Sequence, residues 1–409
     1  MAKDYKDLVV GLDIGTAKVM AVVAEVMPGG ELKLAGLGVS PSNGLKRGVV
    51  VNIDATVQSI QQALKEAELM ADCKISRVYT GITGSHIRGI NSSGMVAVKD
   101  REVTPADVAR VVETARAINI STDQRLLLVE PQEFVIDGQD VKEPIGMSGI
   151  RLEAKVHIVT GAQSAAENIV KCVRRCGLEV EQLMLNPLAS SGAVLTDDEK
   201  ELGVALVDVG AGTTDVAIFT GGAIRHTAVI PIAGDLITSD IAMALRTPTK
   251  DAEDIKVESG FAKQLLADAD QQVEVPGLGD RGPRMLSKQA LAGVIEPRVE
   301  EIFSLVQQVI RESGYEEVLS SGIVLTGGSA VMPGMIELGE DIFLKPVRRG
   351  IPKYTGALSD MVAQPRAATV MGLLEEARLA RIRGHKVAQK HGSVKNAFGR
   401  FKDFIVGNF

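Results

Sequence analysis

A glycine-rich motif flanked by two aspartates, in residues 204–219, constrains the fold of this chain more than any other feature. An apolar run leads to Asp208, a Gly-Ala-Gly-Thr-Thr segment follows Val209, and a second apolar run leaves from Asp215. Two apolar runs separated by a short glycine-rich turn are typical of a β-hairpin. The motif therefore predicts a hairpin with a polar tip and a carboxylate at each end of that tip.

The tip of this hairpin has the composition of a phosphate-binding turn. Gly210 and Gly212 allow backbone N–H groups to approach a ligand without a Cβ in the way, and Thr213 and Thr214 add hydroxyl donors. The flanking carboxylates would repel a bare phosphate, so they make sense mainly with a divalent cation between them. No Gly-x-x-x-x-Gly-Lys-Ser/Thr sequence is present, which argues against a Walker P-loop. Taken alone, the motif could equally be a tight turn that binds no ligand.

The same pattern occurs at the start of the chain, which turns one motif into a duplication. Residues 9–23 contain an apolar run, Asp13, a Gly15-Thr16 turn and a second apolar run. Both copies continue with a Gly-Gly turn, a third strand and a helix. Two halves that each begin with a three-strand meander imply a duplicated α/β fold with a cleft between them. A nucleotide held by both turns would lie in that cleft.

Composition places the chain among ordinary globular proteins. Its 409 residues are enough for two domains, and 45% of them are hydrophobic. No window reaches eighteen consecutive apolar residues, and the polar start argues against a secretory signal, so we expect a cytoplasmic protein. The three cysteines, Cys73, Cys172 and Cys176, lack the partners of a zinc site and are expected to pack in the core.

Charge is distributed unevenly along the chain. The net charge is −7, but the residues from Arg378 to the end carry +7, which leaves −14 for residues 1–377. An acidic body does not favour nucleic acid as a partner, whereas a basic tail suits an anionic surface.

The periodicity predicts six segments in the organisation of the chain. Residues 84–154 have no counterpart in the second half, so we interpret them as an inserted subdomain; a surface for a partner and an insertion without a role both remain open. The expected units are a first core (1–83 and 155–195), this insert (84–154), a second core (196–233 and 289–378), a small second-half subdomain (234–288), a flexible basic linker (379–393) and a terminal amphipathic helix (394–409).

The terminal segment has the pattern of a membrane-binding helix. Its aromatic and aliphatic residues fall on one face at helical spacing, with cations flanking that face. The residues concerned are Phe398, Phe401, Phe404, Ile405 and Phe409, with Lys395, Arg400 and Lys402 beside them. The alternative is a terminal helix that packs on its own body.

Three ordered motifs resemble those of the actin, Hsp70 and sugar-kinase ATPase superfamily. They are Asp-Ile-Gly-Thr from Asp13, with Lys18, then Asp-Val-Gly-Ala-Gly-Thr-Thr-Asp from Asp208, then Leu-Thr-Gly-Gly-Ser from Leu325. Within this superfamily the chain is similar to the FtsA family of bacterial cell-division proteins. FtsA carries its inserted subdomain where residues 84–154 lie, and it ends in an amphipathic helix after a linker.

The resemblance implies roles for matching positions. It implies ATP and Mg²⁺ as cofactors, with the metal near Asp13 and Asp208, and it leaves Asp215 to stabilise its own turn. The implied nucleotide-binding residues are Asp13, Gly15, Thr16, Lys18, Asp208, Gly210, Gly212, Thr213, Thr214, Gly234, Glu253, Lys256, Gly327 and Gly328. For Glu253 and Lys256, an ordinary surface pair three residues apart on a helix is the alternative.

One departure bears on hydrolysis. Several relatives place a carboxylate or glutamine that orients the attacking water where this chain has Asn186 followed by Pro187. An amide can position water but cannot act as a base. We therefore expect tight ATP binding with slow hydrolysis.

The resemblance also implies partners. These are the C-terminal peptide of FtsZ, later division proteins bound through the insert, anionic lipids, and further copies of the chain in filaments, at the cytoplasmic side of the inner membrane. The residues implied for FtsZ are Arg281, Arg284, Lys288 and Arg298. A PilM-like pilus scaffold and a small-molecule kinase of the same superfamily are the alternative functions.

Overall fold

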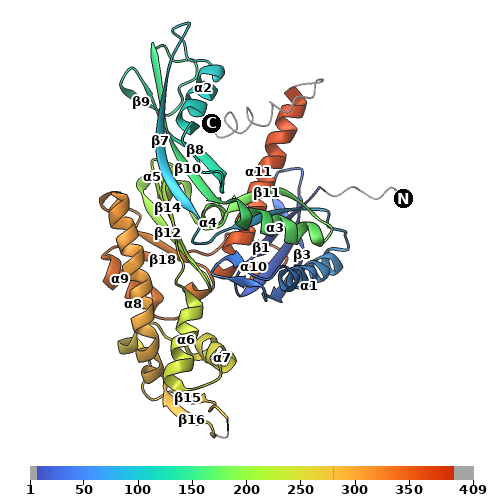
Figure 1. Cartoon of the computed structure of the whole chain (residues 1–409), viewed down its shortest axis with the longest axis vertical. Coiled ribbons are helices and arrows are strands. Elements are labelled where there is room, and N and C mark those ends of the chain that lie inside the picture. The colour runs from blue at the N-terminus through green and yellow to red at the C-terminus, as the bar shows by residue number, and fades with distance from the viewer. Residues whose placement is uncertain (1–6, 280, 391–409) are drawn as a thin grey trace.

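Two halves with the same strand topology form the body of the molecule. The computed structural model describes residues 7–279 and 281–390, and Figure 1 shows their arrangement. Each half has a five-stranded sheet in which an antiparallel three-strand meander is extended by two parallel strands, in the orders β3-β2-β1-β6-β11 and β14-β13-β12-β17-β18. This is the duplication that the repeated motif predicts.

The strands lie close to their predicted positions, because alternating and continuous apolar runs define them. The first sheet consists of β1 (Leu8–Ile14), β2 (Lys18–Val26), β3 (Leu32–Pro41), β6 (Arg77–Ile82) and β11 (Glu179–Leu185). The second consists of β12 (Val204–Val209), β13 (Thr214–Thr220), β14 (Ala223–Ile230), β17 (Ile323–Thr326) and β18 (Val347–Arg349).

Helices cover both faces of each sheet. In the first half, α1 (Ile53–Ala71) and α3 (Gln163–Arg175) bury apolar side chains against one face. On the other face, α11 (Ala368–Lys390) crosses α4 (Asn186–Val194) so closely that a Cβ on Gly372 would lie 1.7 Å from the backbone oxygen of Ala189. The side chain of Asn52 caps α1 by accepting a hydrogen bond from the N–H of Ala55, so this helix begins at Ile53.

The second half has its own helical layer. One face of its sheet is packed by α6 (Gly234–Leu245), α8 (Lys288–Ser313) and α9 (Met335–Phe343), which share a single core. The small subdomain adds α7 (Thr249–Ser259) and a hairpin of β15 (Gln272–Val275) and β16 (Arg284–Ser287). The remaining short elements are β4 (Leu45–Lys46), β5 (Val49–Val50), α5 (Asp197–Leu202) and α10 (Ser359–Val362).

The insert is a four-stranded antiparallel sheet with one helix on it. Its elements are β7 (Arg88–Ala97), α2 (Pro105–Arg116), β8 (Gln124–Ile136), β9 (Gln139–Val141) and β10 (Arg151–Ala162), in the sheet order β7-β10-β8-β9. Pro131 lies inside β8, where a β-bulge opposite Lys155 and Val156 accommodates it within one strand. In Figure 1 the insert stands at one end of the molecule and the β15–β16 hairpin at the other.

The last helix is longer than predicted. The sequence predicts a flexible linker from residue 379, yet α11 continues to Lys390, so the prediction is wrong for residues 379–390. The reason is that basic residues of this stretch pair with acids instead of facing water. Arg381 forms ion pairs with Asp7 and Glu181 at 3.5 and 3.8 Å, and Arg383 lies 3.7 Å from Glu376.

Candidate nucleotide-binding cleft

A cavity of about 440 Å³ lies between the two sheets, at the tips of the two repeated hairpins. It is lined from the first half by the β1–β2 turn and from the second by the β12–β13 turn, α7 and the segment after β17. Thirteen of the predicted residues line it: Asp13, Gly15, Thr16, Lys18, Asn186, Asp208, Gly210, Gly212, Thr213, Glu253, Lys256, Gly327 and Gly328. Distant motifs therefore converge on one site.

Thr214 and Gly234 do not line the cavity. Successive side chains of a strand face opposite sides, so Thr213 faces the cavity while the hydroxyl of Thr214 donates to the backbone oxygen of Ile232 at 2.8 Å. Gly234 begins α6 beneath the turn, where its N–H donates to the carbonyl of Gly210 at 3.1 Å. These bonds give both residues a role in supporting the β12–β13 turn, and their predicted ligand contacts stay predictions.

The two hairpin tips approach each other closely. A Cβ on Gly212 would lie 2.6 Å from the hydroxyl oxygen of Thr16, so a side chain there would separate the tips. The same hydroxyl accepts a hydrogen bond from the N–H of Gly48 at 3.1 Å. Gly327 has a φ of +89° and sits against the carboxylate of Asp208, which a Cβ would approach to 2.4 Å. The site depends on close backbone approach at these two glycines.

Carboxylates at the base of the cavity are buried with few counter-charges. Lys18 pairs with Asp13 at 2.8 Å, and the Ser190 hydroxyl donates to Asp208 at 2.6 Å. Burial raises the pKa of Asp208 to about 6, and the nearby charge of Asp13 adds to this. Burial, followed by the charge of Asp208, raises the pKa of Asp215 to about 7. A cation near these groups would stabilise their ionised form.

Asp215 does more than stabilise its own turn. The Thr213 hydroxyl donates to it at 3.2 Å, in line with the turn role that the resemblance implies. In addition it lines the cavity and accepts a hydrogen bond from Thr83, which follows β6 in the other half. The residue therefore joins the two halves directly. The sequence gives no signal for this bond, because the partners lie far apart along the chain.

Glu253 and Lys256 are not a simple surface pair. The ammonium of Lys256 is buried and lies 2.7 Å from Glu253, 2.8 Å from the hydroxyl of Thr238 and 3.2 Å from the backbone oxygen of Gly234. The pair thus anchors α7 to α6 at the edge of the cavity. The sequence analysis did not identify an apolar wall beside it, formed by Val257, Val331, Met332 and Pro333, nor the lining residues Gln364, Pro365, Arg366 and Thr369 near the start of α11.

The donor set fits Mg²⁺ bound mainly through a phosphate ligand. Within residues 7–279 and 281–390, no group of three or more His, Cys, Asp or Glu side chains could hold a metal ion. Mg²⁺ commonly uses one or two carboxylates together with phosphate oxygens and waters, which Asp13 and Asp208 could provide. Asn186 lines the cavity, and its buried Oδ1 has no hydrogen-bond partner in the protein and lies against Gly81, where a Cβ would approach it to 2.1 Å.

The predicted partner-binding arginines do not form one free patch. Arg298 is held by Asp240 through two contacts, at 2.5 and 3.0 Å, and also contacts Glu301. Arg281 and Arg284 are exposed, although the guanidinium of Arg284 also reaches the carbonyl of Leu245. Lys288 lies 5.9 Å from the centre of the Phe261 ring. The eight predicted membrane-binding residues, in segment 394–409, lie outside the described residues, and no helix in the described part of the chain is long and apolar enough to span a bilayer.

Sequence comparisons place the chain in a known family. Residues 205–372 match the family described as "Cell division protein FtsA", and residues 84–160 match "SHS2 domain inserted in FTSA". The cell division protein FtsA of Pseudomonas aeruginosa is 54% identical over 409 residues, which cover 98% of each chain. The chain belongs to the FtsA family. FtsA of Escherichia coli K12 is 47% identical over 397 residues, covering 95% of this chain and 94% of that protein.

The FtsA assignment agrees with the fold. The structure of a PilM–PilN type IV pilus biogenesis complex is similar with a TM-score of 0.66 at 18% identity, covering 90% of this chain and 98% of that chain. MreB 5 of Spiroplasma citri bound to AMPPNP is similar with a TM-score of 0.56 at 15% identity, covering 92% and 98%. These likenesses confirm the predicted actin-like fold. The match to the inserted domain covers residues 84–160 and ends within β10.

Proposed function

We propose that this chain is an ATP-binding, self-assembling adaptor of cell division that tethers the FtsZ ring to the cytoplasmic side of the inner membrane and recruits later division proteins. The observation that carries the nucleotide part is the convergence of two duplicated hairpin tips on one cavity, with Asp13 and Asp208 at its base. The MreB 5 structures bound to ADP and to AMPPNP, which share the fold, also support nucleotide binding in this cleft.

The lining residues divide into a phosphate side and a nucleoside side. Lys18, the backbone of Gly15 and Thr16, and the opposing turn at Gly212 would hold the phosphates, with Mg²⁺ near Asp13 and Asp208. The apolar wall beside α7 would hold the nucleoside, with Glu253 at its polar edge. Each half supplies part of the contact, so binding favours one angle between the halves.

ATP turnover is expected to be slow. Asn186 is the candidate for positioning the attacking water, and its amide cannot remove a proton. This argues against the kinase alternative, which needs a general base near the transferred phosphate. Steady-state phosphate release by the chain ending at Lys390 tests the proposal. Rates of tens per second, typical of kinases, would contradict it, whereas saturable ATP binding with little release supports it.

Membrane binding is assigned to segment 394–409. The support is its amphipathic sequence and positive charge. The test is sedimentation with anionic liposomes, with and without ATP, for the full chain and for a chain ending at Lys390, which keeps α11 whole. Pelleting of the full chain alone is expected, with less pelleting on neutral liposomes. Equal pelleting of both forms would overturn the assignment.

FtsZ binding is assigned to the small second-half subdomain. This subdomain exposes four large apolar side chains as well as the two arginines: Leu265, Leu266, Leu278 and Met285. The C-terminal peptide of FtsZ would bind to this surface. Fluorescence anisotropy with a labelled FtsZ C-terminal peptide should show weaker binding for the double variant Arg281→Ala/Arg284→Ala. Unchanged binding in that variant, beside an exposed control such as Lys65→Ala, would place the FtsZ site elsewhere.

A further inference from the structure

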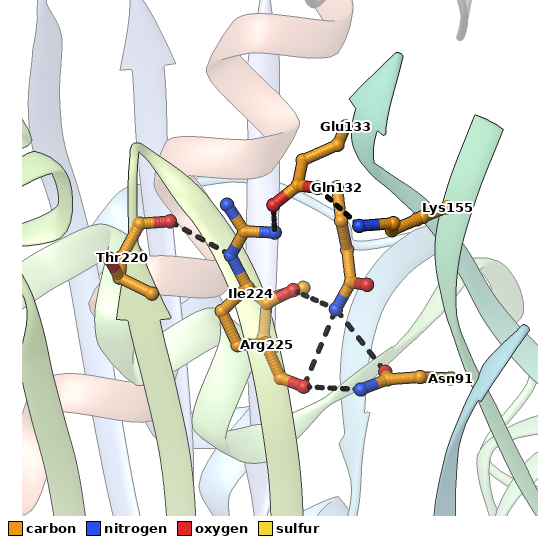
Figure 2. A network of polar contacts seen from close by, with 7 residues as sticks. All are labelled: Asn91, Gln132, Glu133, Lys155, Thr220, Ile224 and Arg225. Atoms are coloured by element: carbon orange, nitrogen blue, oxygen red, sulfur yellow. Dashed lines mark hydrogen bonds and ion pairs between the residues drawn. The ribbon is translucent and has the colours of Figure 1, made fainter. Parts of the chain in front are cut away.

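The insert belongs to the first half by its chain connections but is bonded to the second half. It leaves the first half at Gly84 and returns at the end of β10. Away from these connections, β7, β8 and β10 pack against β14, the edge strand of the second sheet. Polar contacts join them, and Figure 2 shows those made by Asn91, Gln132 and Glu133. We call this set of contacts the clamp: Asn91, Gln132, Glu133 and His157 of the insert with Ile224, Arg225 and Thr227 of β14.

Amide groups form the outer part of the clamp. The side-chain nitrogen of Gln132 donates to the backbone oxygen of Ile224 at 2.8 Å and to that of Arg225 at 3.4 Å. The side-chain nitrogen of Asn91 donates to the backbone oxygen of Arg225 at 3.1 Å. These bonds use carbonyl groups of an edge strand, which would otherwise face solvent. Figure 2 shows both amides directed at the same short stretch of β14.

A buried imidazole forms the inner part. His157 contacts the Asn91 side-chain oxygen through Nδ1 at 2.6 Å and the Thr227 hydroxyl through Nε2 at 2.9 Å. Because an amide oxygen only accepts, Nδ1 carries the proton and Nε2 accepts from the hydroxyl. The two strands also approach closely here, since a Cβ on Gly89 would lie 2.6 Å from the Thr227 hydroxyl oxygen. Both ring nitrogens of the neutral His157 therefore have a hydrogen-bond partner.

An ion pair closes the clamp on its third side. Arg225, with a side chain 11% exposed, lies 2.5 Å from Glu133, which also contacts Lys155 at 2.9 Å. The Arg225 guanidinium in addition donates to the backbone oxygen of Thr220 at 3.1 Å. This bond within the second half holds the Arg225 side chain in position on β14. Its pairing with Glu133 therefore restrains the insert relative to β14.

The opposite side of the insert is less restrained. A cavity of about 1220 Å³ lies between β8 and the elements β11, α4 and α11 of the first half, and it extends along β8 to α5 and the β13–β14 turn of the second half. Near its base the insert joins the first-half core through Ile87 and Val159, and Leu127 and Leu128 of β8 pack against the same core. At the same base, the N–H of Ala162 donates to Nδ1 of His86 at 3.3 Å. The insert therefore has a fixed base, a bonded side and an open side.

We propose that the outer part of the insert moves with the second half, so that it tilts about its base whenever the angle between the halves changes. The clamp holds it to β14, and the cavity beside α11 takes up the motion. The cleft is connected to the base of the insert, because Asp215 of β13 accepts a hydrogen bond from Thr83, the residue that directly precedes the insert. Binding of a partner to the insert and binding of a ligand in the cleft would then influence each other reciprocally.

The proposal rests on the proposed function only in taking nucleotide as the signal that changes this angle. It is tested with pairs of spin labels on non-natural amino acids at exposed positions, which leaves the native cysteines in place. One label replaces Glu113 on α2, and its partner replaces either Glu300 on α8 or Gln62 on α1. The full chain is measured without nucleotide and with ATP and Mg²⁺.

The expected result is a shift of the 113–62 distance with nucleotide and a constant 113–300 distance. The converse, a shifted 113–300 distance with a constant 113–62 distance, would overturn the proposal. If nucleotide changes neither distance, the proposal that nucleotide sets the angle between the halves fails. The distance distributions in the nucleotide-free protein then test whether the insert is held to the second half. A narrower distribution for 113–300 supports the clamp, and a narrower one for 113–62 contradicts it.

A double variant then tests whether the hydrogen bonds of the clamp, and not only the closeness of the two parts, hold the insert to β14. Gln132→Ala with Thr227→Val removes bonds at both ends of the clamp, and each lost hydrogen bond should weaken the clamped state about fivefold. The 113–300 distribution should broaden. The matched control is Gln139→Ala with Thr122→Val, two exposed positions of the insert, which should leave it unchanged. A double variant that behaves like this control would contradict the role of the clamp.

Discussion

The cleft and the clamp both join the halves of this molecule, and they are built from opposite chemistry. At the cleft, Asp208 and Asp215 are buried carboxylates whose pKa values are raised to about 6 and about 7. At the inner clamp, His157 is buried as a neutral imidazole, and burial lowers its pKa to about 4. The carboxylates of the cleft lack enough positive partners, whereas the ring nitrogens of His157 already have hydrogen-bond partners.

The difference indicates which junction responds to a ligand. Ionised groups in a dry site cost free energy that a bound cation can recover, so the cleft is sensitive to what binds there. Neutral groups that are fully hydrogen-bonded gain nothing further from a ligand, so the clamp keeps one arrangement. The cleft therefore has the properties of a switch, and the clamp those of a fixed connection.

The largest effect should come from removing Asp208, the cleft carboxylate that we propose binds the cation. Asp208→Ala is expected to weaken binding of ATP with Mg²⁺ by roughly a hundredfold, because it leaves the opposing charges of the site unpaired at a cost of about 3 kcal/mol. Isothermal titration calorimetry measures this loss. Asp198→Asn, an exposed acid on α5, is the control and should bind ATP normally. Equal affinity for ATP in the wild type and Asp208→Ala would contradict nucleotide binding at this carboxylate of the cleft.

A second variant should stabilise the protein at the same junction. The folded state of Asp215 has a pKa raised from 3.8 to about 7, so its stabilising contribution is complete below pH 3.8 and is lost as the pH rises through 7. Asp215→Asn should therefore raise the free energy of unfolding at pH 8 by about 2 to 3 kcal/mol without nucleotide, and much less at pH 4. Urea denaturation at both pH values measures this. A loss of stability at pH 8 would show that the carboxylate is compensated there.

The clamp should respond to pH in the opposite sense. His157 has a pKa lowered from 6.5 to about 4 by burial, so the unfolded chain takes up a proton between these values and the folded chain does not. This contribution to stability is present above pH 6.5 and decreases as the pH falls, by about 2 kcal/mol at pH 5. The drop in unfolding free energy from pH 7 to pH 5 should thus be smaller by that amount in His157→Gln. An identical drop in both proteins would contradict a buried neutral His157.

The smallest effect is expected at the exposed margin of the clamp. Lys155 pairs with Glu133 but is more than half exposed, so Lys155→Ala should change the free energy of unfolding by only about 0.5 kcal/mol. Arg225→Ala should lower the free energy of unfolding several times more, because it leaves the partly buried carboxylate of Glu133 without its buried partner. Chemical denaturation of the two variants in parallel compares them. Equal losses would mean that burial does not distinguish the two ion pairs.

The cleft could be predicted from sequence because short motifs determine it locally. Each hairpin tip is continuous in the chain, and the duplication brings the two tips together. The supporting role of Thr214 could also be predicted, since neighbouring residues at the start of a strand, such as Thr213 and Thr214, face opposite sides. Asp215 could be found in the motif, but its bond to Thr83 could not.

The clamp and the end of α11 could not be predicted in this way. Asn91, Gln132 and His157 come from three strands and belong to no motif, and their shared target on β14 exists only in the folded protein. The basic residues after Arg378 read as a linker because their acidic partners, such as Asp7 and Glu181, are remote in sequence. Charge composition alone does not distinguish a solvated segment from one paired across a fold.

The distance between the two halves tests the central claim, that ligand in the cleft sets their angle, most directly. Spin labels at Gln62 on α1 and Glu300 on α8 report this distance in the full chain. The account predicts that ATP with Mg²⁺ changes the distance in the wild type and leaves it unchanged in Asp208→Ala. An unchanged distance in wild-type protein that calorimetry shows to be saturated with ATP would contradict the account.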